Sequence, residues 1–222
     1  MAALSGPERP AASGAADSLV ILLHGYGADG ADLIGLAEPL APFLPNTRFV
    51  APDAPDPCVN NPMGRQWFPI PWLDGSSEIA SALAAGKSFA ALDAWLDGVA
   101  ARGTPPERTV LVGFSQGTMM ALQVGPRRKA ALAGIVGFSG RLLQPGRLAA
   151  EIVTRPPVLL IHGDDDPVVP VACLAEAADA LTAVGVETRR HVSRGAGHGI
   201  APDGLRLALA FVRERLGVTV VP

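Results

Sequence analysis

The sequence is poor in cysteine and in charge of either sign. Its two cysteines, Cys58 and Cys173, are far apart and form no CxxC pair, which argues against a disulfide framework and a cysteine-based metal site. The net charge is −3, and the longest basic block is the triplet at residues 127–129. We therefore expect reduced thiols, a cytoplasmic location and no nucleic-acid partner.

Long hydrophobic runs are also missing. The apolar run at residues 19–23 has the length of a strand and is far too short to cross a bilayer. Residues 1–17 consist mainly of Ala, Gly, Pro and Ser and lack an unbroken apolar segment, so we expect a short disordered tail and no secretory signal. Because apolar residues make up 49% of the chain, residues 18–222 are expected to form one globular domain without stable membrane insertion.

Apolar runs typical of buried strands alternate with segments typical of helices along most of the chain. This order predicts an α/β fold with a mostly parallel central sheet, helices on both faces and right-handed crossovers. The predicted strands are residues 19–23, 47–51, 109–112, 132–138, 157–161 and 186–192, and the predicted helices are residues 31–40, 78–102, 118–124, 145–152, 171–183 and 204–216. The apolar face of the long helix 78–102 is predicted to include Ile79, Leu83, Phe89, Leu92, Leu96 and Val99.

A Gly-x-Ser-x-Gly motif stands at the junction of a predicted strand and a predicted helix. Residues 113–117 read Gly-Phe-Ser-Gln-Gly, which is the pattern of the nucleophile elbow of serine hydrolases. The serine must occupy a sharp, strained turn, and a side chain two residues before or after it would collide with a neighbouring strand or helix. We therefore predict that Ser115 is a nucleophile, with the positive end of a helix dipole behind it.

A serine nucleophile needs a histidine base, and that base needs a carboxylate to orient it. Four unusual loops follow predicted strands, at residues 24–30, 113–117, 162–167 and 195–199, and should meet at the carboxyl edge of the sheet. His198 lies in the last of these loops and is the predicted base. The other histidines, His24, His162 and His191, are expected to be structural or solvent-facing.

Three consecutive carboxylates, at residues 164–166, compete for the role of the acid. Asp166 precedes a proline, which favours an extended backbone, and we predict that it orients His198. Asp164 and Asp165 are expected to cap the turn or the next helix. The resulting chain order of Ser115, Asp166 and His198 is that of α/β-hydrolases.

The oxyanion of an acyl-transfer intermediate needs two N–H donors. The predicted donors are the backbone N–H groups of Gln116, the residue after the nucleophile, and of Tyr26, in the loop after an earlier strand. A long proline-rich stretch at residues 52–74 is too aromatic to be disordered. Its side chains either line an acyl-binding groove or cover the core, and the groove candidates are Met63, Trp67, Phe68 and Trp72.

Together these motifs resemble the phospholipase/carboxylesterase family, whose members include bacterial carboxylesterases and acyl-protein thioesterases. The resemblance covers about residues 18–216 and rests on the segments at residues 23–29, 113–117, 162–170 and 197–198. It implies an α/β-hydrolase fold without a large cap domain, no cofactor, and action on carboxylic esters, lysophospholipids or acyl thioesters. It also implies the same triad, the same oxyanion donors and a possible homodimer. Two positions depart from the family pattern, since Tyr26 replaces a common Leu and Pro69 replaces a frequent Asp.

Three other interpretations remain open from the sequence. Residues 25–30 read Gly-x-Gly-x-x-Gly after a predicted strand, and Asp53 follows 23 residues later, a formal match to a dinucleotide-binding fingerprint. The histidines and aspartates of the same loops could serve a metal-dependent hydrolase, although no metal-ligand spacing supports it. The chain could also be a catalytically silent relative of the hydrolases that only binds a ligand.

Overall fold

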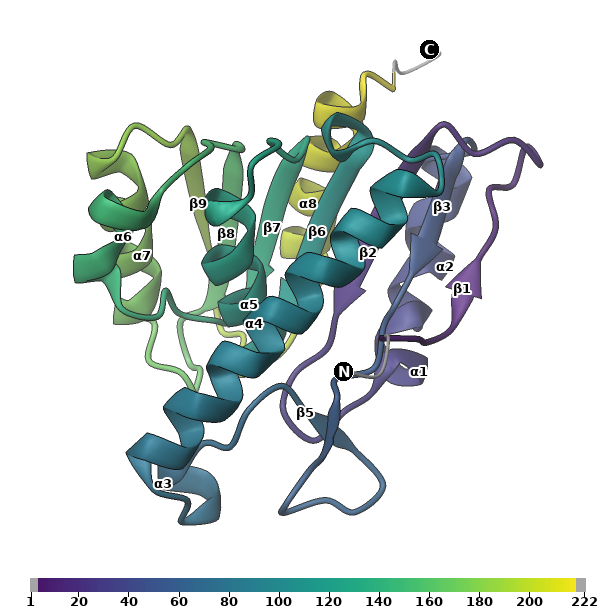
Figure 1. Cartoon of the computed structure of the whole chain (residues 1–222). Helices are drawn as coiled ribbons and strands as arrows, with labels where there is room; N and C mark the ends of the chain where they lie inside the picture. Colours follow the sequence, from purple (N-terminus) through teal and green to yellow (C-terminus); the bar gives the residue numbers. More distant parts are fainter. Residues whose placement is uncertain (1–3, 219–222) are drawn as a thin grey trace.

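A computed structural model describes residues 4–218 of the chain. Its centre is a seven-stranded sheet with the order β1-β3-β2-β6-β7-β8-β9 (Figure 1). Neighbouring strands are parallel except for β1, which is antiparallel to β3. The strands are β1 (Glu8–Arg9), β2 (Ser18–Leu23), β3 (Thr47–Val50), β6 (Thr109–Phe114), β7 (Gly134–Phe138), β8 (Val158–Gly163) and β9 (Thr188–Ser193).

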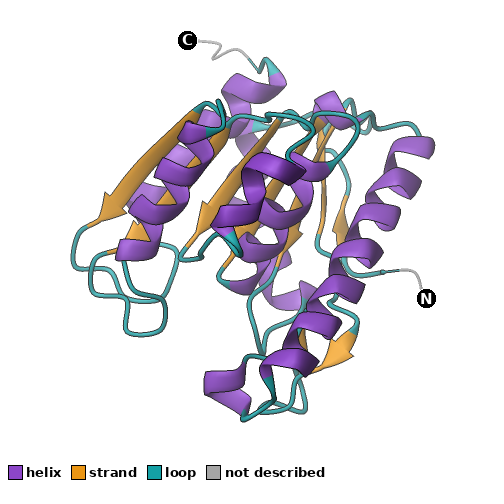
Figure 2. Ribbon diagram, turned by 60° about the vertical axis from the view of Figure 1, so that its left-hand side comes forward, coloured by secondary structure: helices purple, strands orange, loops and turns teal. Residues whose placement is uncertain are grey.

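Helices cover both faces of this sheet (Figure 2). One face carries α4 (Glu78–Ala101), α5 (Gln116–Val124), α6 (Pro145–Glu151) and α7 (Ala172–Ala183), and the other carries α1 (Gly30–Leu33), α2 (Ala37–Leu40) and α8 (Pro202–Leu216). Short 3-10 helices are η1 (Ile34–Leu36), η2 (Ala41–Phe43), η3 (Pro106–Arg108) and η4 (Gly125–Arg127). The long loop before α4 contains a small hairpin of β4 (Asp56–Pro57) and β5 (Arg65–Gln66), followed by α3 (Pro71–Asp74).

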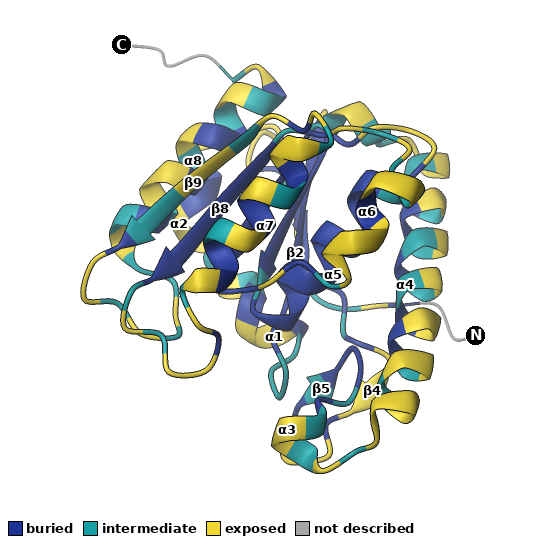
Figure 3. Cartoon of the chain, turned by 90° about the vertical axis from the view of Figure 1, so that its left-hand side faces the viewer, coloured by how far each residue is buried: buried dark blue, intermediate teal, exposed yellow. Residues whose placement is uncertain are grey.

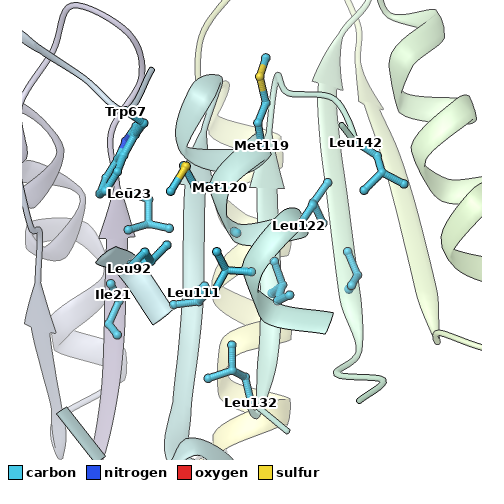
Figure 4. Close-up of a cluster of buried hydrophobic side chains, with 14 of the residues drawn as sticks. Ile21, Leu23, Trp67, Leu92, Leu111, Met119, Met120, Leu122, Leu132 and Leu142 are labelled. Atoms are coloured by element: carbon cyan, nitrogen blue, oxygen red, sulfur yellow. The ribbon is translucent and has the colours of Figure 1, made fainter. Parts of the chain in front are cut away.

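The central strands bury both of their faces (Figure 3). In β2, Ile21 and Leu23 belong to the core cluster beneath α4 and α5, whereas Val20 and Leu22 belong to the cluster beneath α2 and α8. Alternate side chains of a strand point to opposite faces, so a continuous apolar run is what a two-sided core requires. Figure 4 shows part of the first cluster. The predicted α/β fold with a mostly parallel sheet and helices on both faces is confirmed.

The N-terminal segment differs from the predicted disordered tail over residues 1–17. Within its described part, β1 pairs with β3, and the N–H of Ala51 donates to the carbonyl of Pro7 over 3.0 Å. Leu4 and Ala11 are buried. A two-residue strand between prolines has no periodicity to reveal it, because its stability comes from the edge of the sheet that it covers. Residues 1–3 lie outside the described residues.

The long helix α4 buries only part of its predicted apolar face. Leu92, Leu96 and Val99 are buried, whereas Ile79 and Leu83 are 74% and 64% exposed. The prediction for these two side chains is wrong because the first turns of α4 lie beside α3 and not over the sheet (Figure 1). Within residues 4–218, none of the helices combines the length and apolarity needed to cross a membrane.

Candidate active site

Ser115 stands on a strained turn between β6 and α5. Its backbone has φ 53° and ψ −113°, a conformation that non-glycine residues adopt rarely and at an energetic cost. The turn is held because the Ser115 N–H donates to the carbonyl of Phe138 over 2.8 Å. Ser115 is 8% exposed, so its hydroxyl is accessible only within a confined site.

The two glycines of the motif are required by close approaches. A Cβ at Gly117 would overlap the carbonyl oxygen of Leu23 on β2, and a Cβ at Gly113 would overlap the N–H of Thr118 on α5. The predicted collisions with a strand and a helix are therefore both present. The spacing Gly-x-Ser-x-Gly follows from the packing of α5 against β2 and β6.

The structure brings Ser115, His198 and Asp166 together in one hydrogen-bonded line. His198 Nε2 lies 3.0 Å from Ser115 Oγ, and His198 Nδ1 lies 2.8 Å from Asp166 Oδ2. These distances are within the range for proton transfer and for orientation of an imidazole. The His198 ring also packs against Phe114, with ring centroids 5.0 Å apart.

The carboxylate of Asp166 is enclosed, with no exposed side-chain surface. Its Oδ1 accepts from the N–H groups of Val168 and Val169 at 2.8 and 2.9 Å. Burial alone would raise the pKa of Asp166, but the hydrogen bonds from His198 and from these amides outweigh it and hold the pKa below its usual value. Asp166 therefore stays ionised and can fix the His198 ring.

The remaining members of the acidic triplet have other environments. Asp164 accepts from the N–H of Gly195 at 2.6 Å and from Arg194 at 3.2 Å, so it joins the loop after β8 to the loop that carries His198. The hydrogen bond from Gly195 is the main cause that lowers the pKa of Asp164. The side chain of Asp165 is exposed.

The other three histidines contact protein groups away from Ser115. Nδ1 of His24 lies 2.8 Å from the carbonyl oxygen of Gly25, and Nε2 of His24 accepts from the N–H of Ala54 at 2.9 Å. Burial lowers the pKa of His24. His162 bonds to the carbonyl of Val169, and the half-exposed His191 bonds to Asp203. His24 and His191 have the predicted structural or solvent-facing placement, whereas Nε2 of His162 also lies 3.2 Å from Oδ2 of Asp166.

Two backbone N–H groups are available beside the nucleophile. Throughout residues 4–218, neither Tyr26 N nor Gln116 N has a protein acceptor. Gln116 is the first residue of α5, where helix N–H groups are unpaired and the dipole is positive. Gly25 packs directly on the Ser115 turn, since a Cβ at this glycine would lie 3.3 Å from the Cβ of Ser115. The loop after β2 is thereby placed against the elbow.

Asp53 has a structural role next to the glycine-rich loop after β2. Its carboxylate accepts from the N–H of Gly30 at 2.8 Å, so it binds the start of α1. A Cβ at Gly30 would overlap the carbonyl of Ala51, which explains the third glycine by helix packing. Among residues 4–218, no three His, Cys, Asp or Glu side chains are arranged to hold a metal ion.

Comparisons with known proteins identify the family of the chain. The family model described as phospholipase/carboxylesterase matches residues 9–216. The chain belongs to the phospholipase/carboxylesterase family. Esterase YpfH of Escherichia coli is 27% identical over 210 residues, covering 95% of this chain and 86% of that protein. Acyl-protein thioesterase 1 of Saccharomyces cerevisiae is 30% identical over 211 residues, covering 89% of this chain and 92% of that protein.

A solved structure is similar over nearly the whole chain. The crystal structure of esterase PE8 has a TM-score of 0.92 and 50% identity, covering 97% of this chain and all (100%) of that one. That of Arabidopsis thaliana SOBER1 has a TM-score of 0.74 and 26% identity, covering 90% of this chain and 99% of that one. As a member of this family, the chain is a carboxylic-ester hydrolase of the α/β-hydrolase type.

The large groove of this hydrolase lies between α3, α4, α5 and α6. It has a volume of about 910 Å³. Met119 lines it, one helical turn after Ser115, and the Met119 N–H donates to the Ser115 carbonyl at 3.2 Å. The groove therefore begins beside the elbow, although the triad side chains are not part of its wall. Its apolar wall includes Phe68, Ile70, Trp72, Phe89, Met119 and Leu143.

The four aromatic and Met candidates of residues 52–74 have different placements. Phe68 and Trp72 line the groove. Trp67 is completely buried in the core, and Met63 is 88% exposed and lies outside the groove wall. Phe89 and Met119 were missed as groove residues because their spacing is equally typical of core positions. The i, i+4 relation of Ser115 and Met119 was the available signal.

Proposed function

We propose that the chain hydrolyses carboxylic esters and acyl thioesters through an acyl-enzyme intermediate on Ser115. The observation that carries this proposal is the position of His198, whose two ring nitrogens lie within 3.0 Å of Ser115 Oγ and 2.8 Å of Asp166 Oδ2. A serine hydroxyl is a weak nucleophile by itself, and this arrangement supplies the base that it needs.

The first half of the reaction forms the acyl-enzyme. Ser115 Oγ attacks the carbonyl carbon of the substrate while His198 Nε2 takes the hydroxyl proton. Asp166 stabilises the imidazolium without taking the proton itself. His198 then protonates the leaving alcohol or thiol as the bond between it and the carbonyl carbon breaks. In the second half, a water molecule loses a proton to His198 and attacks the acyl carbon. The bond between that carbon and Ser115 Oγ then breaks, His198 returns the proton to Oγ, and the carboxylic acid is released.

Negative charge on the carbonyl oxygen needs stabilisation in both halves. We assign this role to the N–H groups of Tyr26 and Gln116, because both lie beside Ser115 and have no acceptor within the described residues. Loss of one such donor costs about 3 kcal/mol of transition-state stabilisation in other hydrolases. The strained backbone of Ser115 supports this assignment, because a serine on such a turn presents its hydroxyl at the N-terminus of the following helix.

The groove supplies the substrate class. Its apolar wall next to the elbow, with Phe68, Phe89 and Met119, suits the acyl chain of an ester. Relatives are named esterase and acyl-protein thioesterase, and oxygen esters, lysophospholipids and thioesters share the same chemistry. The cytoplasmic location rests on the composition and on the two buried, unpaired thiols, and a homodimer rests on family analogy.

The alternative functions explain fewer observations. A ligand-binding protein without activity would leave the strained serine and its hydrogen-bonded base unused. A dinucleotide-binding protein would need an acid that is available to a ribose, whereas the Asp53 carboxylate is bound to Gly30. Hydrolysis accounts for both the strain and the line of hydrogen bonds.

Hydrolysis of p-nitrophenyl butyrate by the wild type, Ser115→Ala and Ser18→Ala tests the proposal. Ser18 is a matched control, because it is a buried serine at the amino end of β2, away from the loops of the site. We expect kcat/KM to fall at least about 1,000-fold in Ser115→Ala and to change little in Ser18→Ala. Retention of most activity by Ser115→Ala would exclude Ser115 as the nucleophile. A wild type that neither turns over the ester nor is phosphonylated by a fluorophosphonate, with loss of fluoride, would favour a binding protein.

A further inference from the structure

Trp67 has no exposed surface and lies between three parts of the site. It follows β5, and its ring packs against the ring of His24 with centroids 5.5 Å apart. Figure 4 shows it in the same buried cluster as Leu23 and Met120. A buried side chain of this size can have no role beyond filling the core, but the hydrogen bonds of Trp67 indicate a second role.

The polar groups of Trp67 bind both segments that carry the proposed oxyanion donors, the loop after β2 and the start of α5. Its Nε1–H donates to the carbonyl of His24 over 3.0 Å, two residues before Tyr26. Its backbone N–H donates to Oε1 of Gln116 over 2.9 Å. The hydroxyl of Ser88, on α4, donates to the Trp67 carbonyl. One residue thus connects the Tyr26 loop, the first residue of α5 and the middle of α4.

The partners of Trp67 are themselves fixed. Gln116 is completely buried, and its Nε2 donates to the carbonyl of Phe68 over 2.8 Å, so its side chain cannot turn away. His24 is completely buried and bonds through both ring nitrogens, to Gly25 and to Ala54. Movement of the Trp67 indole would therefore move the peptide that leads into Tyr26, relative to Gln116.

We propose that Trp67 is a positioning residue that sets the separation and direction of the Tyr26 and Gln116 N–H groups. The inference rests on the oxyanion hole in the proposed function. The two donors belong to different elements, the loop after β2 and the start of α5, and hydrogen-bond strength falls steeply with poor alignment. Donors aimed at an oxyanion act mainly in the transition state, so their misplacement lowers kcat and leaves KM nearly unchanged.

Trp67→Phe tests this proposal because it keeps an aromatic ring and removes the Nε1–H that reaches His24. We expect kcat for p-nitrophenyl butyrate to fall about tenfold while KM stays within about twofold. Binding of a trifluoromethyl ketone, which adds to Ser115 Oγ and places negative charge on its oxygen, should weaken by a similar factor. Binding of butan-1-ol, which has no carbonyl or carboxylate oxygen for the two N–H donors, should not change.

Trp95→Phe is the matched control. Trp95 is a half-buried tryptophan of α4 whose indole makes no hydrogen bond within residues 4–218. The control should keep kcat and the ketone affinity. A folded Trp67→Phe variant with wild-type kcat and ketone affinity would overturn the proposal, as would equal losses of ketone and butan-1-ol binding.

Gln116→Met provides a second variant if Trp67→Phe does not fold. It removes both side-chain hydrogen bonds to residues 67 and 68 and keeps the backbone N–H of residue 116. The same selective loss of kcat and ketone affinity is expected, and wild-type values would overturn the proposal. Failure of the proposed function itself is distinguishable, because the wild type would then form no ketone adduct and Ser115→Ala would keep its activity.

Discussion

His162 Nε2 lies 3.2 Å from Asp166 Oδ2, the same oxygen that His198 Nδ1 reaches at 2.8 Å. His162 Nε2 also lies 2.9 Å from the carbonyl of Val169. Because both of these neighbours are acceptors, Nε2 carries the hydrogen. The Nε2–H of His162 is hydrogen-bonded to the Val169 carbonyl and lies beside Asp166 Oδ2. The Asp166 carboxylate therefore accepts from the His198 imidazole on Oδ2 and from two backbone N–H groups on Oδ1, with the second imidazole close to Oδ2.

This relationship predicts the effect of replacing His162. His162→Leu removes the polar N–H that lies beside the Asp166 carboxylate. It also leaves the buried carbonyl of Val169 without its partner, which costs about 1–3 kcal/mol of unfolding free energy. We expect kcat/KM to fall about tenfold as well, because Asp166 then orients His198 less firmly. Ester hydrolysis and thermal unfolding of the same preparations measure the two effects.

His191→Leu is the control for His162→Leu. His191 is half-exposed and bonds to Asp203, away from the triad, so its replacement should leave kcat/KM within twofold of the wild type. If both variants retained wild-type kcat/KM, the second imidazole on Asp166 would have no part in catalysis.

The hydrogen bond from Gly195 to Asp164 leads to a prediction on the loop that carries His198. Asp164→Ala removes the acceptor at 2.6 Å from the Gly195 N–H, and we expect kcat/KM to fall about tenfold because the loop is held less firmly. Asp165→Ala changes the adjacent, exposed carboxylate and should have no effect. Measurement of kcat/KM for both variants side by side tests this prediction. Equal values of kcat/KM would contradict the role assigned to Asp164.

The turn at Ser115 and the proximity of Ser115, Asp166 and His198 could be predicted because each signal lies at the end of one strand. The glycines around Ser115 are dictated by overlaps with residues 23 and 118, and every protein with this turn must meet the same constraint. The order of Ser115, Asp166 and His198 follows from which strands end at the carboxyl edge of a parallel sheet. Both inferences needed only the sequence near each strand end.

The placements of Trp67 and of the N-terminal segment could not be predicted, because their partners are remote in the sequence. Trp67 bonds to residues 24, 88 and 116, and no local pattern separates such a tryptophan from one that lines a groove. The pairing of β1 with β3 likewise joins residues about forty positions apart in the chain. For Ile79 and Leu83 the local pattern is clear but misleading. Their helical spacing is that of a buried face, whereas both side chains are exposed because the sheet does not extend beneath them.

The ion pair of Asp203 with His191 predicts a pH dependence of stability. The hydrogen bond from His191 is the main cause that lowers the pKa of Asp203 to about 2, against about 3.9 in an unfolded chain. Between pH 4 and 2 the unfolded state then binds more protons than the folded state, so this contribution to stability is lost as the pH falls through that window. It is fully present above about pH 5.

Asp203→Asn should therefore have a Tm that falls less steeply from pH 4 to pH 2 than that of the wild type, by about 2 °C over the window. Asp165→Asn, which replaces an exposed carboxylate without a side-chain partner in the described part of the chain, should follow the wild-type curve. Calorimetry in steps of half a pH unit measures both. Parallel curves for the wild type and Asp203→Asn would show that the native pKa of Asp203 is not depressed.

The groove beside α4 offers a test of acyl-chain binding that does not touch the triad. Gly86 lines the groove, and a Cβ built on it meets no atom within 4 Å. Leu at this position fits the helix and projects into the space that an acyl chain would fill. We expect Gly86→Leu to lower kcat/KM for p-nitrophenyl octanoate at least tenfold relative to p-nitrophenyl acetate, since the acetyl group is too short to reach the obstruction.

Ala94→Leu on the same helix serves as the control for Gly86→Leu. Ala94 is exposed and lies outside the groove wall, so the ratio of octanoate to acetate hydrolysis should stay at the wild-type value. An unchanged ratio in both variants would mean that the acyl chain leaves Ser115 in another direction. In that case the groove between α4 and α6 would bind the leaving group instead. Esters with the same acyl chain and different alcohols test this alternative, because Gly86→Leu would then slow the hydrolysis of esters of bulky alcohols alone.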